Sequence, residues 1–369
     1  MPNLKIANAS EVAVWSKDYT AEYVRDTGFK PYISSKDDAI IRVRNELTGK
    51  DGAVIHMPYV ARLTGAGVSG GQALYGNEDV LQNYSSALRA KLIRNGVAIP
   101  ESETFRTVLD IANAVRYSLK NWSAEKLRDD LIGALNSLVV QSGLDSDGTY
   151  IEDTYLPFIA DSSAANAHVT NNSDRLLFGN LNSNLVAGSM KNSLATVTAS
   201  QTMNARLVTL MKSKAQSLTK FKIRPVRVDT DAGREWFVLF VGPEAYRDLT
   251  NDPVINQANR DARVRGLEDN PIFQGGDLVY SGVIIRQVQE MPMVGTVGAT
   301  SARLVQSHLC GVNSLALGWA KMPEPRTQQF DYGFQNNLAI TEIRGQAKFS
   351  VAGVQTGMVT CYHAGALDA

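Results

Sequence analysis

The chain has 369 residues, 44% of them hydrophobic and 20% charged, which is an ordinary globular composition with enough apolar residues for a sizeable core. Its 37 Lys and Arg residues balance its 37 Asp and Glu residues, so no general electrostatic attraction to nucleic acid or to an anionic membrane is expected. The sequence shows neither a signal peptide nor an apolar run of about 18 residues, which argues against secretion by that route and against a membrane span.

Residues 1–45 have no regular hydrophobic period. Short apolar pieces alternate there with turn residues, and none of them is long enough to define a helix or a buried strand. We therefore interpret this segment as an extended N-terminal arm.

The next segment has the pattern of a long hairpin. Alternate positions are apolar, as in a strand with one buried face: Ala53, Ile55, Met57, Tyr59, Ala61 and Leu63. A return strand is predicted from Tyr84, Leu88, Ala90 and Leu92, although Leu81, Tyr84, Leu88 and Leu92 also fit a helical stripe. The glycine-rich residues 65–76 form the turn region between them.

A hairpin of this length leaves open strand edges and an apolar face far from its own core. Such a feature is a liability unless another chain covers it, so we expect the hairpin to be an interface between subunits. The candidate interface residues are Ile55, Met57, Tyr59, Leu63, Gly65, Gly67, Gly70, Asn77 and Glu78.

A long amphipathic helix is predicted after the hairpin. Apolar residues recur at three- and four-residue spacing from Phe105 to Trp122. Ser123 is a possible N-cap of a second helix that continues the spacing through Leu138 and stops at Gly143. One bent helix and two successive helices both fit this pattern.

The remainder mixes helices and strands without a regular alternation, which favours the α+β class. We expect surface loops with brief elements over 143–200. Further elements are predicted as a helix around 207–211, strands at 223–229, 236–242 and 278–286, and helices at 244–249 and 254–266. The strand at 236–242 is almost continuously apolar, which predicts a central position in a sheet.

One motif suggests chemistry. Gly65, Gly67 and Gly70 have the spacing of a dinucleotide-binding loop, but Gly71 and Gly76 are poor starts for the required helix. Ala90 stands where an acidic residue would hold a ribose. A flexible hairpin tip with positive φ angles explains these glycines better.

No catalytic, cofactor or metal site is predicted. The four histidines are dispersed, and Cys310 and Cys361 are far apart and match neither a metal-ligand spacing nor a redox motif. Two cysteines without such a motif are typical of a protein from a reducing compartment.

Six segments carry a resemblance to a known family. They follow the expected order over most of the chain: 63–68 (LTGAGV), 74–78 (LYGNE), 240–243 (FVGP), 270–273 (NPIF), 330–333 (FDYG) and 345–348 (GQAK). With the arm, the hairpin and the long helix, they resemble the major capsid proteins of tailed bacteriophages, in the branch typified by the coliphage that packages its own RNA polymerase. The fold of that family is shared with the herpesvirus capsid floor.

The resemblance implies an architecture. It places an N-terminal arm at 1–45, an extended hairpin loop at 46–104, a peripheral domain with a spine helix at 105–225 and 330–369, and an axial domain at 226–329. It also implies a structural protein, with no enzymatic activity and no cofactor. This protein would self-assemble through hexamers and pentamers into an icosahedral shell in the virion.

The implied partners follow from that role. They are other copies of the chain and packaged double-stranded DNA without sequence-specific contact, with scaffold, portal and decoration proteins as further candidates and no membrane. Assembly is expected in the bacterial host cytoplasm. Two alternatives remain open: a nucleotide-binding enzyme that uses the loop at Gly65 to Gly70, and another structural subunit of a virion.

Overall fold

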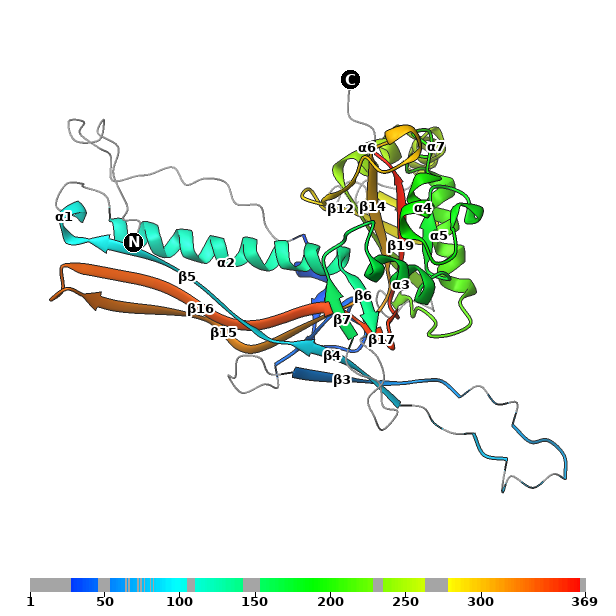
Figure 1. Cartoon of the computed structure of the whole chain (residues 1–369), viewed down its shortest axis with the longest axis horizontal. Coiled ribbons are helices and arrows are strands. Elements are labelled where there is room, and N and C mark those ends of the chain that lie inside the picture. The colour runs from blue at the N-terminus through cyan, green and yellow to red at the C-terminus, as the bar shows by residue number, and fades with distance from the viewer. Residues whose placement is uncertain are drawn as a thin grey trace.

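The structure is a computed structural model that describes residues 28–45, 54–63, 65, 67–71, 73, 75, 77–79, 81, 83–104, 110–141, 153–227, 235–262 and 278–365. Figure 1 shows two parts, an elongated part containing the long helix α2 and a compact lobe. A two-stranded hairpin projects from their junction. The α+β class predicted from the sequence is confirmed.

The elongated part is built on a five-stranded sheet with the strand order β1-β2-β15-β16-β5. Its strands are β1 (Ile33–Ser34), β2 (Ile41–Arg44), β5 (Lys91–Pro100), β15 (Leu315–Phe330) and β16 (Gln335–Lys348). The strands β5, β16 and β15 are antiparallel, whereas β2 pairs in parallel with β15. The short helices η2 (Lys30–Tyr32) and α1 (Glu101–Thr104) precede β1 and follow β5.

The helix α2 (Ile111–Asn136) lies along this sheet as one continuous element. The side chain of Asp110 caps it by accepting a hydrogen bond from the backbone N–H of Asn113 (3.1 Å). Its first turns bury an apolar face against β5 and β16, in a cluster made of Ile99, Ile111, Val115, Leu119, Leu338 and Ile340. The helix therefore runs through Ser123 without a break, which settles the choice between one helix and two.

The predicted helical boundaries need correction. The helix ends at Asn136, and Leu138 belongs to β6 (Leu138–Gln141), which pairs with β7 (Asp153–Leu156). Local spacing could not separate Leu138 from the helix because a buried strand and a buried helical turn contain the same apolar residue types. The predicted start at Phe105 lies outside the described residues.

The compact lobe is built on an eight-stranded mixed sheet. Its main path is β11-β12-β10-β14-β19-β8, with β9 paired to β10 and β13 paired to β14. These strands are β8 (Leu176–Phe178), β9 (Val226–Arg227), β10 (Glu235–Val241), β11 (Leu278–Tyr280), β12 (Val283–Gln287), β13 (Met293–Gly295), β14 (Leu304–Cys310) and β19 (Met358–Ala364). A small hairpin of β17 (Ser350–Val351) and β18 (Val354–Gln355) connects β16 to β19.

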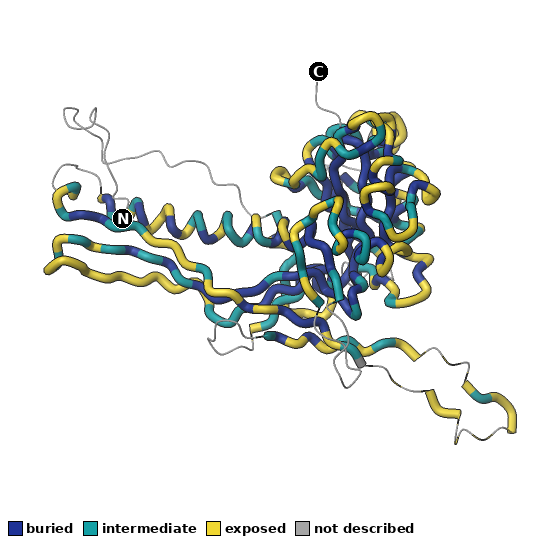
Figure 2. Tube along the Cα trace, viewed as in Figure 1, coloured by how far each residue is buried: buried dark blue, intermediate teal, exposed yellow. Residues whose placement is uncertain are grey.

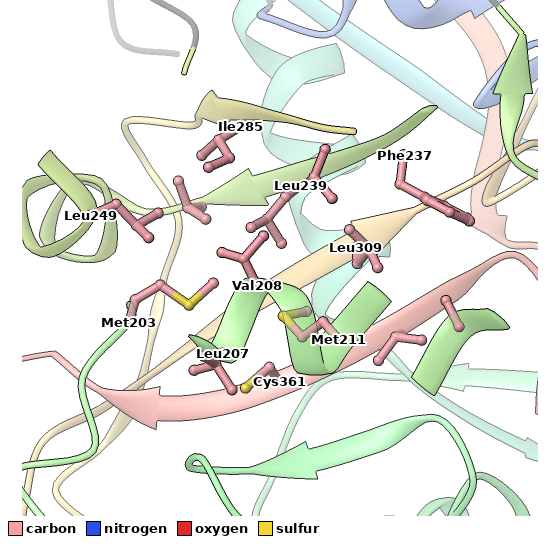
Figure 3. Close-up of a cluster of buried hydrophobic side chains, with 14 of the residues drawn as sticks. Met203, Leu207, Val208, Met211, Phe237, Leu239, Leu249, Ile285, Leu309 and Cys361 are labelled. Atoms are coloured by element: carbon pink, nitrogen blue, oxygen red, sulfur yellow. The ribbon is translucent and has the colours of Figure 1, made fainter. Parts of the chain in front are cut away.

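Helices cover the lobe. They are α3 (Ser163–Asn171), η3 (Asn182–Asn184), α4 (Met190–Ala195), α5 (Ala205–Ser217), α6 (Pro243–Asn251), α7 (Pro253–Ala262) and η5 (Ala299–Ser301). Figure 3 shows α5 against one face of the sheet, where Leu207, Val208 and Met211 meet Leu239, Leu309 and Cys361. The predicted helices around 207–211, 244–249 and 254–262 are thereby confirmed, and residues 263–266 lie outside the described residues.

The strand β10 is central, as predicted, and both of its faces are buried. Leu239 contacts the α5 side, whereas Val238 and Phe240 pack on the other side with Phe29, Leu131 and Leu135. This second cluster joins the sheet of the lobe to α2 and to Phe29, Ile40 and Ile41, so it holds the two parts together. Burial on both faces explains why the sequence of β10 is apolar at consecutive positions.

The interpretation of residues 1–45 as an arm does not fit the described stretch 28–45. Phe29, Ile40 and Ile41 are buried in the core cluster of their own chain, and β2 pairs with β15. The paired residues Ile41 and Leu315 are 274 positions apart in the sequence, and such long-range pairing leaves no local period. Residues 1–27 lie outside the described residues.

The predicted loops at 143–200 also need correction for 153–200. Here α3, β8 and α4 supply a buried cluster with Val169, Leu176, Phe178, Met190 and Leu194. The brief elements were anticipated, but their polar sequence concealed a core that forms only with Leu304 and Tyr362 from distant strands. The predicted strand at 223–229 contains only β9 among its described residues, and the strand at 278–286 is two strands joined by a turn at Ser281 and Gly282.

The packing divides the chain differently from the predicted domain boundaries. The elements at 163–217 and β19 belong to the compact lobe, whereas β15 belongs to the sheet of the elongated part. Similarly, β5 leaves the hairpin after Ala90 and pairs with β16 over its whole length. Each part is assembled from segments far apart in the chain.

Candidate assembly surface

The predicted hairpin is present as β3 (Val54–Val60) and β4 (Asn83–Arg89). The two strands are antiparallel, and their register places Ile55 opposite Leu88 and Tyr59 opposite Tyr84. The strand β3 ends at Val60, three residues before the predicted end at Leu63. The alternation of apolar residues therefore predicted both strands of the hairpin, except that Leu92 belongs to β5 and pairs with Ile343 of β16.

The base of the hairpin packs on its own chain. The apolar face of β3 and β4 forms a cluster with the sheet of the elongated part and the β17 region, made of Ile55, Met57, Leu88, Ala316, Ala347, Phe349 and Val351. Tyr59 is half-buried beside it, with its ring centroid 5.8 Å from that of Phe221 and 6.1 Å from that of Phe349. The hydrophobic effect is thus satisfied within one subunit at the base.

Two of the candidate interface residues are therefore corrected. Ile55 is 7% exposed and Met57 is 1% exposed, both covered by their own chain. Their alternating pattern signalled burial correctly, but sequence alone could not show whether the covering residues came from the same chain or from another.

The tip of the hairpin is different, because it extends away from both parts of the molecule. Figure 2 shows exposed residues along this projection. Leu63 is 58% exposed, Tyr75 is 92% exposed and Leu81 is 53% exposed, and the candidate residues Gly65, Gly70, Asn77 and Glu78 are exposed as well. Large apolar side chains on a projecting loop are typical of a surface that another protein covers.

Hydrogen bonds within the tip shape its described residues. The backbone N–H of Gly65 donates to Asp79 Oδ2 (2.6 Å), and Asn77 Nδ2 donates to the carbonyl oxygen of Ala73 (3.0 Å). Gly67 and Gly70 have φ angles of 66° and 71°, in the left-handed region that glycine adopts at little cost. The glycines therefore serve the turn, as the sequence indicated.

The structure contradicts the nucleotide-binding alternative. A dinucleotide loop needs a helix N-terminus directly after the glycines, because its backbone N–H groups hold the pyrophosphate. The described residues between 65 and 81 contain no helix. Gly65 to Gly70 thus lack the structural context of a phosphate site.

In the described part of the chain, other chemical groups give no indication of a reactive centre. Among the described residues, no group of three or more His, Cys, Asp or Glu side chains could hold a metal ion. Cys310 and Cys361 are free and buried, and burial raises the pKa of the Cys310 thiol to about 12. Within the described part of the chain, no helix is long and apolar enough to cross a membrane.

A second exposed projection was missed as a candidate site. The turn between β15 and β16 presents Phe330, Tyr332 and Phe334, all largely exposed at the far end of the elongated part. Asp331 and Tyr332 both have positive φ angles there (51° and 52°). The alternation of aromatic residues at 330, 332 and 334 was the available signal.

A wide subunit with exposed apolar projections at two extremities belongs to the class of structural proteins that assemble with further copies. Its family follows from the comparisons. A family model described as phage capsid protein matches residues 3–367, so the chain belongs to the phage capsid protein family. It is therefore a structural component of a phage virion.

Individual relatives agree with this assignment. A chain in the capsid of cyanophage Pam1 is 35% identical, with a TM-score of 0.85 and complete coverage of both chains. The major capsid protein of Pseudomonas phage KPP25 is 24% identical over 347 residues, which cover 91% of this chain and 88% of that protein. The capsid of Ralstonia phage GP4 contains the same fold, with a TM-score of 0.73 at 19% identity and coverage of 100% and 99% of the two chains.

Proposed function

We propose that copies of this chain assemble through hexamers and pentamers into an icosahedral shell around a phage double-stranded DNA genome, in the host cytoplasm. The observation that carries this proposal is the hairpin tip, which presents Leu63, Tyr75 and Leu81 to solvent beyond the rest of its own subunit. A neighbouring copy that covers these side chains would remove apolar surface from water at each contact.

Two architectural roles belong to the proposal. The compact lobe corresponds to the axial domain around the centre of each capsomer, and the elongated part to the peripheral domain. The aromatic turn at Phe330, Tyr332 and Phe334 is then available for contacts between neighbouring subunits. Because such contacts are heterologous, their angle sets the curvature and closure of the shell.

Further partners stay predictions. Scaffold, portal and decoration proteins, and the branch within the family, follow only from the resemblance. The zero net charge is compatible with DNA that is enclosed without dedicated basic tails. The protein is proposed to act without catalysis and without a cofactor.

The tip contact can be tested with purified full-length protein. In the double variant Leu63→Ser and Tyr75→Ser, we expect the loss of shells in negative-stain micrographs and an unassembled species in size-exclusion chromatography. Ile159→Ser is the matched control, because Ile159 is an exposed apolar residue of the compact lobe. Shells from the tip variant at the wild-type yield would exclude the hairpin tip as an assembly contact.

A further inference from the structure

A continuous chain of hydrogen bonds lies between the elongated part and the compact lobe. Lys348 Nζ donates to Gln355 Oε1 (3.2 Å), and Gln355 Nε2 donates to Thr360 Oγ1 (3.4 Å). His308 then links Thr360 to Asn136, with Nδ1 3.1 Å from Thr360 Oγ1 and Nε2 2.9 Å from Asn136 Oδ1. Lys348, Gln355, Thr360, His308 and Asn136 are all buried.

Both ends of this chain belong to the elongated part. Lys348 is the last residue of β16, and Asn136 is the last residue of α2. The middle belongs to the compact lobe, because His308 and Thr360 face each other on β14 and β19. A rotation of the lobe relative to α2 and β16 therefore has to break at least one of these hydrogen bonds.

The hydrogen bonds have one consistent direction. Asn136 Nδ2 donates to the sulfur of Met291 (3.5 Å), so its Oδ1 faces His308 and accepts from Nε2–H. A neutral imidazole carries a single N–H, so Nδ1 of His308 is an acceptor for the hydroxyl of Thr360. Each group thus donates to the next, from Lys348 to Asn136.

The direction depends on a neutral His308. A proton on Nδ1 would replace the acceptor that the Thr360 hydroxyl needs, and it would place a charge in a site fully shielded from water. Burial lowers the pKa of His308 well below its usual value, and the nearby Lys348 lowers it further. The closed arrangement therefore resists this proton, whereas an opened and hydrated junction would accept it.

Lys348 heads the chain without an acidic partner among the described residues. Its hydrogen bond goes to the neutral amide of Gln355, and the titratable groups that interact with it electrostatically are Cys310 and His308 on β14 and His168 on α3. Burial lowers the pKa of Lys348 to about 7. None of these neighbours is a carboxylate that could balance a charge on its amine.

We propose that the series of hydrogen bonds from Lys348 to Asn136 is a proton-sensitive latch that fixes the orientation of the compact lobe relative to the elongated part. Hydration of the junction restores the ordinary proton affinity of both basic groups, so falling pH favours the open state. Lys348 contributes to this pH dependence between about pH 10.4, its ordinary pKa, and about pH 7, its pKa when buried. His308 contributes below about pH 6.5. In each window, the ratio of closed to open subunits falls by up to about tenfold per pH unit.

The orientation can be followed by the distance between two spin labels. Gln329→Cys at the far end of β15 and Asn251→Cys at the end of α6 are both exposed, whereas Cys310 and Cys361 are buried. The full-length, unassembled subunit carrying both labels is measured from pH 9 to pH 5, with near-UV circular dichroism as the check on folding. We expect a second, displaced distance to grow as the pH falls, while the subunit remains folded.

Variants separate the two windows. Lys348→Met and Gln355→Glu should each remove the response above pH 7, the first by deleting the amine and the second by giving it a carboxylate partner. His308→Gln should remove the response below about pH 6.5. His363→Gln is the matched control, because it deletes a buried imidazole that hydrogen-bonds with Ser307 inside the compact lobe and takes no part in the hydrogen-bond chain, and its distances should respond as in the wild type.

Three results would overturn the latch. They are a wild-type distance that stays constant while the subunit remains folded, a wild-type response that persists in both lysine-window variants and in His308→Gln, and global unfolding before any change in distance. The use of both Lys348→Met and Gln355→Glu keeps the test decisive if one of them does not fold.

Discussion

Gly318 and Gly345 lie directly opposite each other on β15 and β16, at the place where the base of the hairpin crosses the sheet. A Cβ atom at Gly318 would lie 2.1 Å from Ile55 Cδ1, and one at Gly345 would lie 2.2 Å from the carbonyl oxygen of Arg89. The hairpin therefore packs directly against the backbone of β15 and β16 at these two glycines. This contact orients the hairpin and, with it, the exposed tip.

Substitution of these glycines should destabilise the subunit to different extents. Gly345→Ala places its new methyl group against backbone, which cannot rotate away, so we expect a loss of about 3 kcal/mol in the free energy of unfolding. In Gly318→Ala the obstacle is the end of the Ile55 side chain, which can change rotamer, and the loss should be about 1 kcal/mol. Urea unfolding followed by tryptophan fluorescence measures both.

Gly133→Ala is the matched control for these substitutions. Gly133 lies inside α2, and a Cβ atom there would meet nothing within 4 Å. The alanine should therefore raise the free energy of unfolding by about 0.5–1 kcal/mol through its higher helix propensity. Equal losses for Gly345→Ala and Gly318→Ala would contradict the role assigned to the backbone contact.

Local patterns were sufficient for the hairpin and for α2. Alternation along β3 gave the strand and its buried face, and the spacing from Phe105 to Leu138 gave the helical region that contains α2, since both signals lie within neighbouring residues. The central position of β10 was equally readable from its continuous apolar run. For these elements, the apolar pattern of neighbouring residues is enough to predict which positions are buried.

Long-range pairing could not be predicted in this way. The strand β2 is short, and its partner β15 lies far along the chain. In β15 itself, every residue from Pro323 to Phe330 is exposed, so no hydrophobic alternation marks it as a strand. The burial of Ile55 and Met57 by their own chain likewise depends on Ala347 and Phe349, which are nearly 300 residues away.

Arg344 joins α2 to the sheet through buried ionic contacts. It lies 2.7 Å from Asp130 Oδ2 on α2 and 3.0 Å from Glu342 Oε1 on its own strand. Ser123 donates a further hydrogen bond to Glu342 (3.2 Å). Arg344→Ala would leave the buried carboxylate of Glu342 without its cation, so we expect a loss of about 3–5 kcal/mol in the free energy of unfolding.

Lys126→Ala is the control for Arg344→Ala, because Lys126 pairs with the same Asp130 (2.8 Å) from a more exposed position. Its removal should cost only about 0.3–0.5 kcal/mol, the usual range for an exposed pair on a helix. Chemical unfolding of both variants at one pH measures the two losses in the free energy of unfolding. Similar losses would show that burial adds nothing to the contribution of the Arg344 contacts.

Both thiols should be inert in the folded subunit. Cys310 and Cys361 have no exposed surface, and burial raises the pKa of each thiol, which keeps the reactive thiolate scarce. A chromogenic disulfide reagent should therefore label fewer than about one in ten thiols under native conditions and two per chain in denaturant. Rapid native labelling of either cysteine would contradict the packing of β14 and β19.

The stability of the subunit should fall in acid because its buried histidines are held neutral. Burial lowers the pKa of His168 to about 3, whereas the unfolded chain restores a value of about 6.5. Between these two values the unfolded state binds a proton that the folded state refuses, so stability is retained above about pH 6.5 and declines as the pH falls towards 3. His168→Gln should make the urea midpoint less dependent on pH between 6.5 and 4, since its side chain does not titrate. A wild-type midpoint that stays constant over this range would refute the assignment.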